Sequence, residues 1–270
     1  MSLKAMDTIH LFYEEFAANF VRDYIHGNER VKRQRRFLSM ALPRESGKIL
    51  ILGCGSGETA FHIATKVAPC ARILGVDISA AALEVAKSLF AHEQIEYRHG
   101  DIIDAIAETP SGEWDYIILP DVYEHIARER RAALHARLNS LLTKDGAVLL
   151  TIPSPAKQEF LRASGTGLQP IDEIVTLEDL AELGTDIRGT ITYFNIISVW
   201  QRNDYVHAVI QRGGDQTGPI GLVESVPLRG WPHRGLLVRG LEFLLYRLRV
   251  FKLQVLFRRL RARRYLRRGL

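Results

Sequence analysis

The chain has 270 residues, of which 47% are hydrophobic and 25% charged, and this composition indicates an ordinary globular protein with one large domain or one domain and an appendage. Its two cysteines exclude a disulfide framework, so we expect reduced thiols and a cytoplasmic protein. No uninterrupted apolar run approaches the roughly 20 residues of a membrane span, and the first seven residues do not show the pattern of a signal peptide.

The net charge of +5 conceals an uneven distribution. Residues 229–270 hold 13 of the 36 lysines and arginines but only one of the 31 acidic residues, Glu242, so residues 1–228 carry a net charge of −7. An acidic body with a strongly basic end predicts that the end is an interaction segment. The acidic body also argues against nucleic acid as the substrate.

Two helices are expected at the start of the chain. Apolar and aromatic residues recur at near-helical spacing over residues 3–26, and a basic helical stretch from Glu29 to Leu42 stops at Pro43. We expect residues 1–42 to form a helical cap.

A buried strand and a glycine turn follow. Residues 49–52 are four aliphatic residues in a row, which is typical of a buried parallel strand. Gly53, Gly55 and Gly57 come next, and a helical stretch begins at Glu58. A strand that turns through glycines into a helix offers backbone N–H groups to a ligand, and a side chain in the turn would keep the ligand away. The spacing G-x-G-x-G differs from the dinucleotide fingerprint G-x-G-x-x-G, which argues against a nicotinamide-dependent oxidoreductase.

Strands and helices then alternate. The expected strands are residues 72–76, 95–99, 114–119 and 147–152, with a helix over 80–90 and a long helical stretch that ends at Leu142. With the first strand they make five strands with crossovers, which predicts a doubly wound parallel sheet. Asp77, Asp101 and Asp121 come at the ends of three of these strands. A ligand of an open α/β sheet lies outside the carboxyl ends of the strands, so we expect these carboxylates to face it.

The alternation stops at Pro153. We expect residues 154–170, which contain glycines and prolines, to form a lid or insertion rather than a core element. A short helix capped by Thr176 and an antiparallel pair of strands over residues 190–200 and 205–211 should close the sheet.

The glycine turn, followed by acids at successive strand ends, resembles the cofactor motifs of the class I S-adenosylmethionine (SAM) dependent methyltransferases. The resemblance implies SAM as the cofactor and a Rossmann-like, doubly wound, seven-stranded and mostly parallel α/β sheet with N-terminal helices and a basic C-terminal helical appendage. It implies that Asp77 accepts hydrogen bonds from the ribose hydroxyls and Asp101 from the adenine amino group. The implied cofactor-binding residues are Tyr13, Gly53, Cys54, Gly55, Gly57, Asp77, Ile78, Asp101, Ile102, Pro120 and Asp121.

Two of these implications leave alternatives open. The family usually has an acidic residue two positions before the first glycine, where this chain has Ile51. Either backbone carbonyls or another carboxylate hold the amino end of the methionine, or SAM binds more weakly than usual. Residues 12–16 resemble the aromatic-rich helix that lies over the SAM pocket, and Tyr13 is the residue expected against the cofactor. Packing of Tyr13 on the body is the alternative.

Residues 119–126, L-P-D-V-Y-E-H-I, resemble the D-V-L-E-H-I motif of small-molecule methyltransferases, including those that methylate ubiquinone precursors. The motif lies where the methyl acceptor meets the cofactor, so His125 is the candidate general base for a hydroxyl acceptor. A structural histidine is the alternative. Asp121, Glu124 and His125 could also share a helix face and hold a divalent ion, but no further ligands are visible and we expect no metal.

The resulting organisation is a cap over residues 1–42, a SAM-binding domain over 43–212, a linker over 213–232 and a basic amphipathic helical tail over 233–270. An apolar stripe beside seven arginines between Arg258 and Arg268 fits a helix on an anionic membrane, and docking on the acidic body is the alternative.

We therefore expect a methyltransferase that acts on an oxygen or nitrogen of a small-molecule or lipid-linked acceptor. We expect it in the cytoplasm, and peripheral contact with a membrane is an open alternative. A non-catalytic module of the same fold, which binds a membrane or a partner protein through its tail, is the competing hypothesis.

Overall fold

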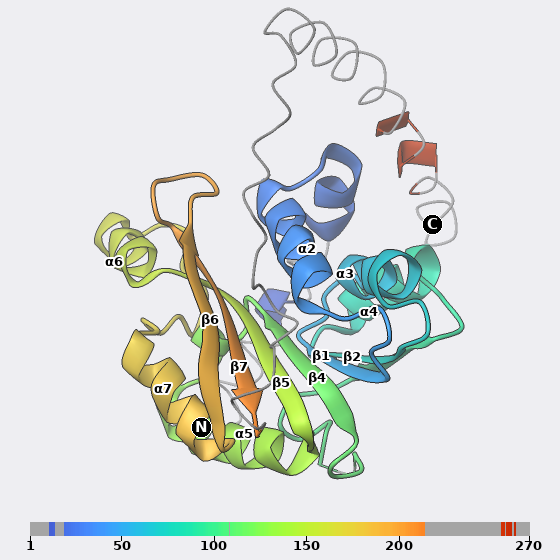
Figure 1. The fold of residues 1–270 in the computed structure, drawn as a ribbon. Helices are drawn as coiled ribbons and strands as arrows, with labels where there is room; N and C mark the ends of the chain where they lie inside the picture. Colours follow the sequence, from blue (N-terminus) through green and yellow to red (C-terminus); the bar gives the residue numbers. More distant parts are fainter. Residues whose placement is uncertain are drawn as a thin grey trace, which may run out of the picture.

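The computed structural model describes residues 11–13, 19–107, 109–213, 255–256, 258–260 and 262. Seven strands form one sheet in the order β3-β2-β1-β4-β5-β7-β6 (Figure 1). The strands are β1 (Lys48–Leu52), β2 (Arg72–Asp77), β3 (Ile95–His99), β4 (Trp114–Pro120), β5 (Leu142–Pro153), β6 (Gly189–Ile197) and β7 (Tyr205–Arg212). Strands β1 to β5 pair in parallel, whereas β7 pairs antiparallel with both β5 and β6. The expected doubly wound, mostly parallel sheet is confirmed.

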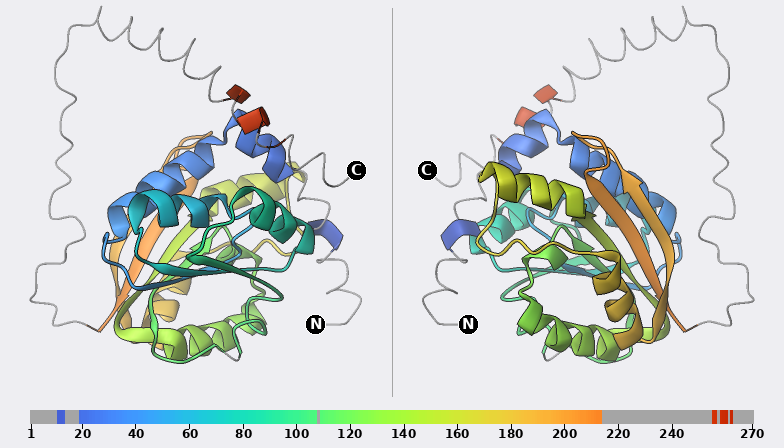
Figure 2. Two further views of the ribbon diagram at one scale, coloured as in Figure 1. Left: turned by 90° about the vertical axis from the view of Figure 1, so that its right-hand side faces the viewer. Right: turned by 90° about the vertical axis from the view of Figure 1, so that its left-hand side faces the viewer.

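Helices cover both faces of this sheet (Figures 1 and 2). They are α2 (Glu29–Ala41), α3 (Glu58–His62) with the π-helical turn η1 (Ile63–Val67), α4 (Ala80–Leu89), the 3-10 turn η2 (Tyr123–His125), α5 (Arg128–Leu141), α6 (Pro155–Ser164) and α7 (Leu177–Asp186). The layer of α2, α3 and α4 lies on one face and that of α5 and α7 on the other (Figure 2).

Alternate residues of β1 face opposite layers, which explains why this strand is apolar throughout. Ile49 and Ile51 are fully buried in the cluster that contains Leu38 of α2. Leu50 and Leu52 are fully buried in the cluster that contains the leucines of α5. The glycine turn after Leu52 is therefore anchored by a strand that is packed on both sides.

Side-chain caps begin the helices where the sequence predicts them. Ser79 Oγ accepts a hydrogen bond from the backbone N–H of Ala82 at 3.1 Å and begins α4. Thr176 and Asp179 form a reciprocal capping box at the start of α7. Such caps satisfy N–H groups that the first turn of a helix leaves without partners.

The structure corrects the long helical stretch expected before Leu142. Asp121 has a left-handed backbone with φ of 56°, and the chain is extended at Ile126 before α5 begins at Arg128. These two conformations reduce the first part of the stretch to the single turn η2. Strand β5 also begins at residue 142, earlier than expected.

A second correction concerns residues 154–170, which contain a regular helix. Ser154 Oγ accepts from the backbone N–H of Lys157 at 3.2 Å, and Pro155 stands at the first position of α6, where its missing N–H costs nothing. Gly165, with φ of 65°, ends the helix in the left-handed conformation. Pro155 and Gly165 are therefore the signals that begin and end α6, while Gly167 and Pro170 follow it.

The two ends of the chain are described in part. Residues 11–13 and 19–26 are helical, as expected, and the remainder of the expected first helix, the linker over 214–232 and most of the basic tail lie outside the described residues. Arg258 donates to the backbone carbonyl of Tyr24 at 3.2 Å, and Ala262 is fully buried. This part of the tail therefore packs against the cap. Among the residues that the structure describes, no helix is long and apolar enough to cross a bilayer.

Candidate active site

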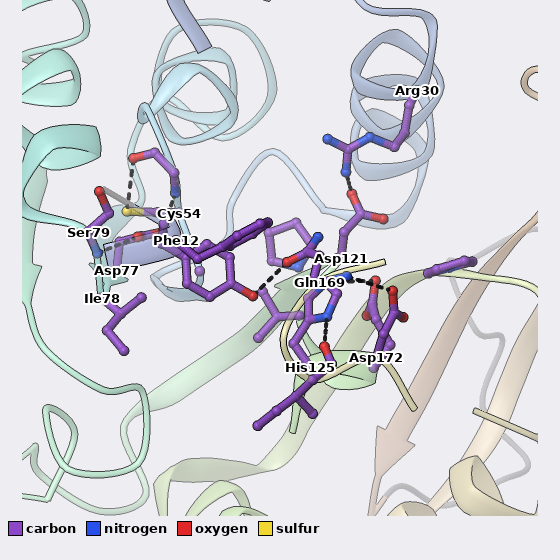
Figure 3. Close-up of a pocket in the computed structure, with 18 of the residues that line it drawn as sticks. Phe12, Arg30, Cys54, Asp77, Ile78, Ser79, Asp121, His125, Gln169 and Asp172 are labelled. Atoms are coloured by element: carbon purple, nitrogen blue, oxygen red, sulfur yellow. Dashed lines mark hydrogen bonds and ion pairs between the residues drawn. The ribbon is translucent and has the colours of Figure 1, made fainter. Parts of the chain in front are cut away.

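A cavity of about 750 Å³ opens where the glycine turn, the carboxyl ends of β2 and β4, the cap and the segment after α6 meet. The predicted site residues that line it are Tyr13, Gly53, Cys54, Gly55, Asp77, Ile78, Asp101, Ile102, Pro120, Asp121 and His125. Figure 3 shows Asp77, Ile78 and Ser79 at one end of the cavity and His125, Gln169 and Asp172 at the other.

The cap packs against the glycine turn. Gly55 has φ of 53°, a conformation that glycine adopts at little cost, and a Cβ on it would lie 3.2 Å from the ring of Phe20. The turn therefore forms a narrow cradle of main chain, in which a side chain at this position would press against the ring of Phe20.

Gly57 was expected in this cradle, and the structure places it behind the turn. A Cβ on Gly57 would lie 2.8 Å from Cβ of Ala86 in α4 and still closer to the hydroxyl of Tyr97. Gly57 is not among the cavity-lining residues of the described chain. This glycine allows the turn to pack against α4.

The Asp77 carboxylate is fixed by the main chain around it. Its Oδ2 accepts from the N–H of Gly55 at 2.7 Å, and its Oδ1 accepts from the N–H of Ser79 at 3.0 Å. These bonds fix the orientation of the carboxylate at the wall of the cavity. The position and the fixed orientation of Asp77 suit the predicted ribose contact.

The Cys54 side chain packs on β2. A Cβ on Gly75 would lie 2.9 Å from the Cys54 sulfur, so the strand needs glycine at this point. Burial, and then the charge of Asp77, raise the pKa of the Cys54 thiol well above its ordinary value. The thiol therefore stays protonated and contributes packing rather than nucleophilic chemistry.

Asp101 reaches the cavity together with a cation that the sequence did not predict. The two terminal nitrogens of Arg130 donate to its two oxygens, both at 2.9 Å, and the N–H of Ile103 donates to Oδ1 at 2.9 Å. Burial opposes ionisation of the Asp101 carboxyl, but the bonds from Arg130 and Ile103 outweigh it and lower its pKa. The predicted adenine contact would therefore involve a carboxylate already paired with an arginine.

At the other end of the cavity, His125 is oriented by the chain after α6. Its Nδ1 lies 2.7 Å from the carbonyl oxygen of Ile171, and its ring centroid is 6.4 Å from that of Tyr13. The Tyr13 hydroxyl donates to Oε1 of Gln169 at 2.7 Å. Tyr13 therefore lies on the His125 side of the cavity, held by residues of the segment expected to be a lid.

Glu124 is the buried acidic neighbour of His125. Its Oε1 lies 3.7 Å from His125 Nε2, and its Oε2 has no hydrogen-bond partner among the described residues. Burial raises the pKa of the Glu124 carboxyl, while the charge of a protonated His125 would lower it. The two side chains are thus electrostatically linked.

The structure does not support the alternative metal site. Asp121 precedes η2 with a left-handed backbone, so it does not share a helix face with Glu124 and His125, and its carboxylate pairs with Arg30 instead. Within the described part of the chain, no group of three or more His, Cys, Asp or Glu side chains is arranged to hold a metal ion.

Sequence reasoning missed Arg30, Arg130, Gln169 and Ile171. The two arginines belong to helices whose basic residues recur at many positions, and no pattern marks which of them reach the cavity. The last two follow α6, and the glycines and prolines around them, which indicated a lid, were the available signal.

Comparison with known proteins agrees with this geometry. Residues 49–146 match a family model described as a methyltransferase domain. An uncharacterized methyltransferase of Mycobacterium tuberculosis is 31% identical over 125 residues, which cover 46% of this chain and 60% of the relative. The nocamycin O-methyltransferase of Saccharothrix syringae is 30% identical over 140 residues, which cover 47% of this chain and 45% of that enzyme. The chain thus spans about half the length of the curated relatives it matches.

A solved structure shares the fold. The putative SAM-dependent methyltransferase of Listeria monocytogenes aligns with 66% of this chain and 97% of its own, with a TM-score of 0.55 and 16% identity. The order of the strands, the position of the cavity and the match to the family model agree with one another. The chain has the class I SAM-dependent methyltransferase fold.

The cavity residues fit SAM as the cofactor. The main-chain cradle at Gly55, which a Cβ would fill, and the fixed carboxylate of Asp77 are suited to a nucleoside with hydroxyl donors. Both open into the cavity that contains His125 at its far end, so cofactor and acceptor can share one enclosed space.

Proposed function

We propose that this protein is a SAM-dependent methyltransferase that methylates a hydroxyl oxygen of a small and largely apolar acceptor. The observation that carries the proposal is the hydrogen bond between His125 Nδ1 and the carbonyl of Ile171, because it determines which ring nitrogen can act as a base.

A carbonyl oxygen only accepts hydrogen bonds, so Nδ1 of His125 carries a proton. In the neutral imidazole the lone pair is then on Nε2. A hydroxyl of the acceptor that donates to this nitrogen would give up its proton there as the oxygen becomes the nucleophile. Glu124, 3.7 Å from Nε2, would stabilise the imidazolium that forms.

The cofactor end of the cavity supports the same proposal. Asp77 and the turn at Gly55 would hold the ribose, with Asp101 and Ile102 beside the adenine. When bound, SAM supplies a methyl group already activated as a sulfonium, so the protein contributes alignment, exclusion of water and the removal of one proton.

Several large apolar side chains line the cavity. Phe12, Leu161, Leu168 and Trp200 line the cavity, and Leu168 and Trp200 are 38% and 56% exposed at its rim. Exposed apolar side chains around a cavity favour an apolar ligand. The name of the Saccharothrix syringae relative, an O-methyltransferase, is consistent with transfer to oxygen.

The test is transfer of labelled methyl from SAM to a panel of phenols, alcohols and amines of similar size, and to fractions of an extract. Incorporation into a hydroxyl compound that falls strongly in His125→Gln supports the proposal. Absence of SAM binding by calorimetry would refute the methyltransferase itself. Labelling confined to amines, with turnover unchanged in His125→Gln, would refute the hydroxyl acceptor and the base.

A further inference from the structure

The turn η2 contacts the cavity through some of its residues and the core through another. Glu124 and His125 line the cavity, whereas Tyr123 is fully buried in the cluster that contains the leucines of α5. Within the described part of the chain, Tyr123 is not among the residues that line the cavity. The histidine to which we assign proton removal is therefore carried by a turn whose first residue is held in the core.

Tyr123 begins a chain of hydrogen bonds that ends at the surface. Its hydroxyl lies 2.8 Å from Nε2 of His135 in α5, and Nδ1 of His135 lies 2.6 Å from Oδ2 of Asp186, the last residue of α7. His135 is 1% exposed, while the side chain of Asp186 is 41% exposed. The rings of Tyr123 and His135 are stacked, with 5.9 Å between their centroids. The chain of hydrogen bonds thus joins η2, α5 and α7.

The direction of each hydrogen bond in this chain follows from the chemistry of its members. An ionised carboxylate only accepts hydrogen bonds, so Nδ1 of His135 carries a proton, and the lone pair of the neutral ring is on Nε2. Burial raises the pKa of the Tyr123 phenol, so the hydroxyl keeps its proton and donates to Nε2. The Asp186 carboxylate therefore selects the tautomer of His135 that accepts from Tyr123.

A second contact from α5 holds the other side of the turn. The Arg131 guanidinium lies over the Tyr123 ring, 4.8 Å from its centroid, and its Nε donates to the carbonyl of Ile126 at 3.2 Å. The residues on both sides of Glu124 and His125 are therefore held by side chains of α5.

We propose that the chain of three side chains positions the general base, because it fixes η2 in the orientation that directs Nε2 of His125 toward the acceptor. Tyr123, His135 and Asp186 act through η2 and do not contact the acceptor or the cofactor. The inference rests on the proposed function, because it assumes that His125 removes the proton. A displacement of a reacting group by about 1 Å can lower a rate by about 10²-fold, so a small shift of η2 is enough to reduce turnover.

Two variants break the chain of hydrogen bonds at its two ends without introducing a larger side chain. Tyr123→Phe keeps the ring and removes only the hydroxyl, and Asp186→Ala removes the acceptor of the Nδ1 proton from a partly exposed site. Single-turnover transfer of labelled methyl, SAM affinity by calorimetry and thermal unfolding are measured for each. We expect turnover to fall about tenfold in each variant and SAM affinity to stay within about twofold, because the cofactor contacts are unchanged.

The double variant distinguishes one chain from two separate contacts. If both residues act through the same chain, a second break adds nothing, so turnover in the double variant should equal that of the slower single variant. Two independent contacts would instead multiply to a loss of about a hundredfold.

Glu182→Ala is the matched control. Glu182 is exposed on α7 one turn before Asp186, and the charges of both act on the Tyr123 phenol. The control removes the same charge from the same helix but leaves the hydrogen bond between Asp186 and His135 in place. It should leave turnover unchanged.

Nitrogen NMR of the histidine side chains gives a readout that does not depend on turnover. It reports which ring nitrogen carries the proton, and spectra of His125→Gln and His135→Gln assign the two rings by difference. In the wild type, both rings should have the proton on Nδ1. In Tyr123→Phe and Asp186→Ala, the ring of His125 should populate both tautomers, because it is no longer held beside the carbonyl of Ile171.

Each result supports or overturns the inference. A His125 ring that keeps one tautomer in both variants would overturn it, and so would turnover within about twofold of the wild type. Losses that multiply in the double variant, or that also occur in Glu182→Ala, would overturn it as well. Asp186→Ala decides alone if Tyr123→Phe does not fold. A wild type that transfers no methyl group would remove the proposed function, and the tautomer of His125 would still show whether the chain of hydrogen bonds positions this ring.

Discussion

The Asp77 carboxylate accepts a hydrogen bond from the backbone N–H of Gly55 at 2.7 Å, which joins the end of β2 to the glycine turn after β1. The residue expected to contact the ribose therefore also holds the turn that surrounds the ligand. Its two roles can be separated by experiment.

Asp77→Ala should weaken SAM binding and lower the melting temperature of the ligand-free protein. Each lost hydrogen bond to the charged group contributes about 1.5–3 kcal/mol, which corresponds to a melting shift of several degrees in a domain of this size. Calorimetry and thermal unfolding measure the two effects. A dissociation constant that rises less than about threefold would show that the ribose is held elsewhere, whatever the melting temperature does.

His125→Ala should reduce turnover by about 10²–10⁴-fold, the usual contribution of a general base, while SAM affinity stays within about twofold. Single-turnover rates at several pH values measure this. His92→Ala is a suitable control, because His92 packs near Phe61 outside the cavity. A loss below about fivefold at every pH would make His125 a structural residue.

Acid should destabilise the fold through His207, which is buried on β7 and stacks on Phe37 of α2 with 4.7 Å between ring centroids. Burial, and then the charge of Arg33, lower its pKa from 6.5 to about 4. Between these values the unfolded chain binds a proton that the folded protein excludes, so stability falls as the pH drops from 6.5 to about 4. The loss should be about 3 kcal/mol.

Urea unfolding of the wild type and His207→Phe at pH 7.5 and about pH 4.5 tests this expectation. The variant keeps an aromatic ring beside Phe37 but cannot take up a proton, so it should lose less stability in acid. Some acid sensitivity should remain, because burial and then the charges of Arg35 and Lys66 lower the pKa of His62 to about 4 as well. Equal losses in both proteins would exclude His207 as a cause.

Deletion of residues 229–270 should leave SAM binding intact, because every cavity-lining residue described precedes residue 206. The deletion removes 13 basic side chains, each worth about 1 kcal/mol near an anionic bilayer, so any sedimentation with anionic vesicles at low salt should be lost. Vesicles of neutral lipid and high salt serve as controls. Failure of the intact chain to sediment would exclude membrane contact.

The same deletion tests the contact between the tail and the cap. It removes the hydrogen bond from Arg258 to the carbonyl of Tyr24, and Arg258→Ala should reproduce any loss of melting temperature that it causes. Unfolding of the body on deletion would show that the tail serves chiefly to stabilise the cap.

The sequence predicts the sheet and the cofactor end of the site because their signals are local. The apolar run 49–52 predicts a strand, and the glycines after it predict a turn. Acidic residues at the carboxyl ends of neighbouring strands lie close together in a doubly wound sheet. The acceptor end is different. Ile171 reaches His125, and Arg30 reaches Asp121, only because the chain after α6 and the helix α2 pack over the sheet, and no spacing in the sequence records such contacts.

The backbone at Asp121 shows a second limit. The residues around it have the polar and apolar pattern of a helix, so the sequence favours one. Tertiary packing overrides that preference, because the hydrogen bond from Asp121 N–H to the Thr151 carbonyl extends the pairing of β4 with β5 and draws the chain away from the helical path.

The packing of Cys54 on Gly75 gives the protein an internal reporter. The chain has two cysteines, and Cys70 is exposed while Cys54 is buried beneath the glycine turn. An alkylating reagent should therefore modify Cys70 first and Cys54 only during rare openings of the turn. The delay between the two modifications, read by mass spectrometry, reports on opening of the turn, and a ligand seated in the turn should lengthen that delay as its occupancy rises.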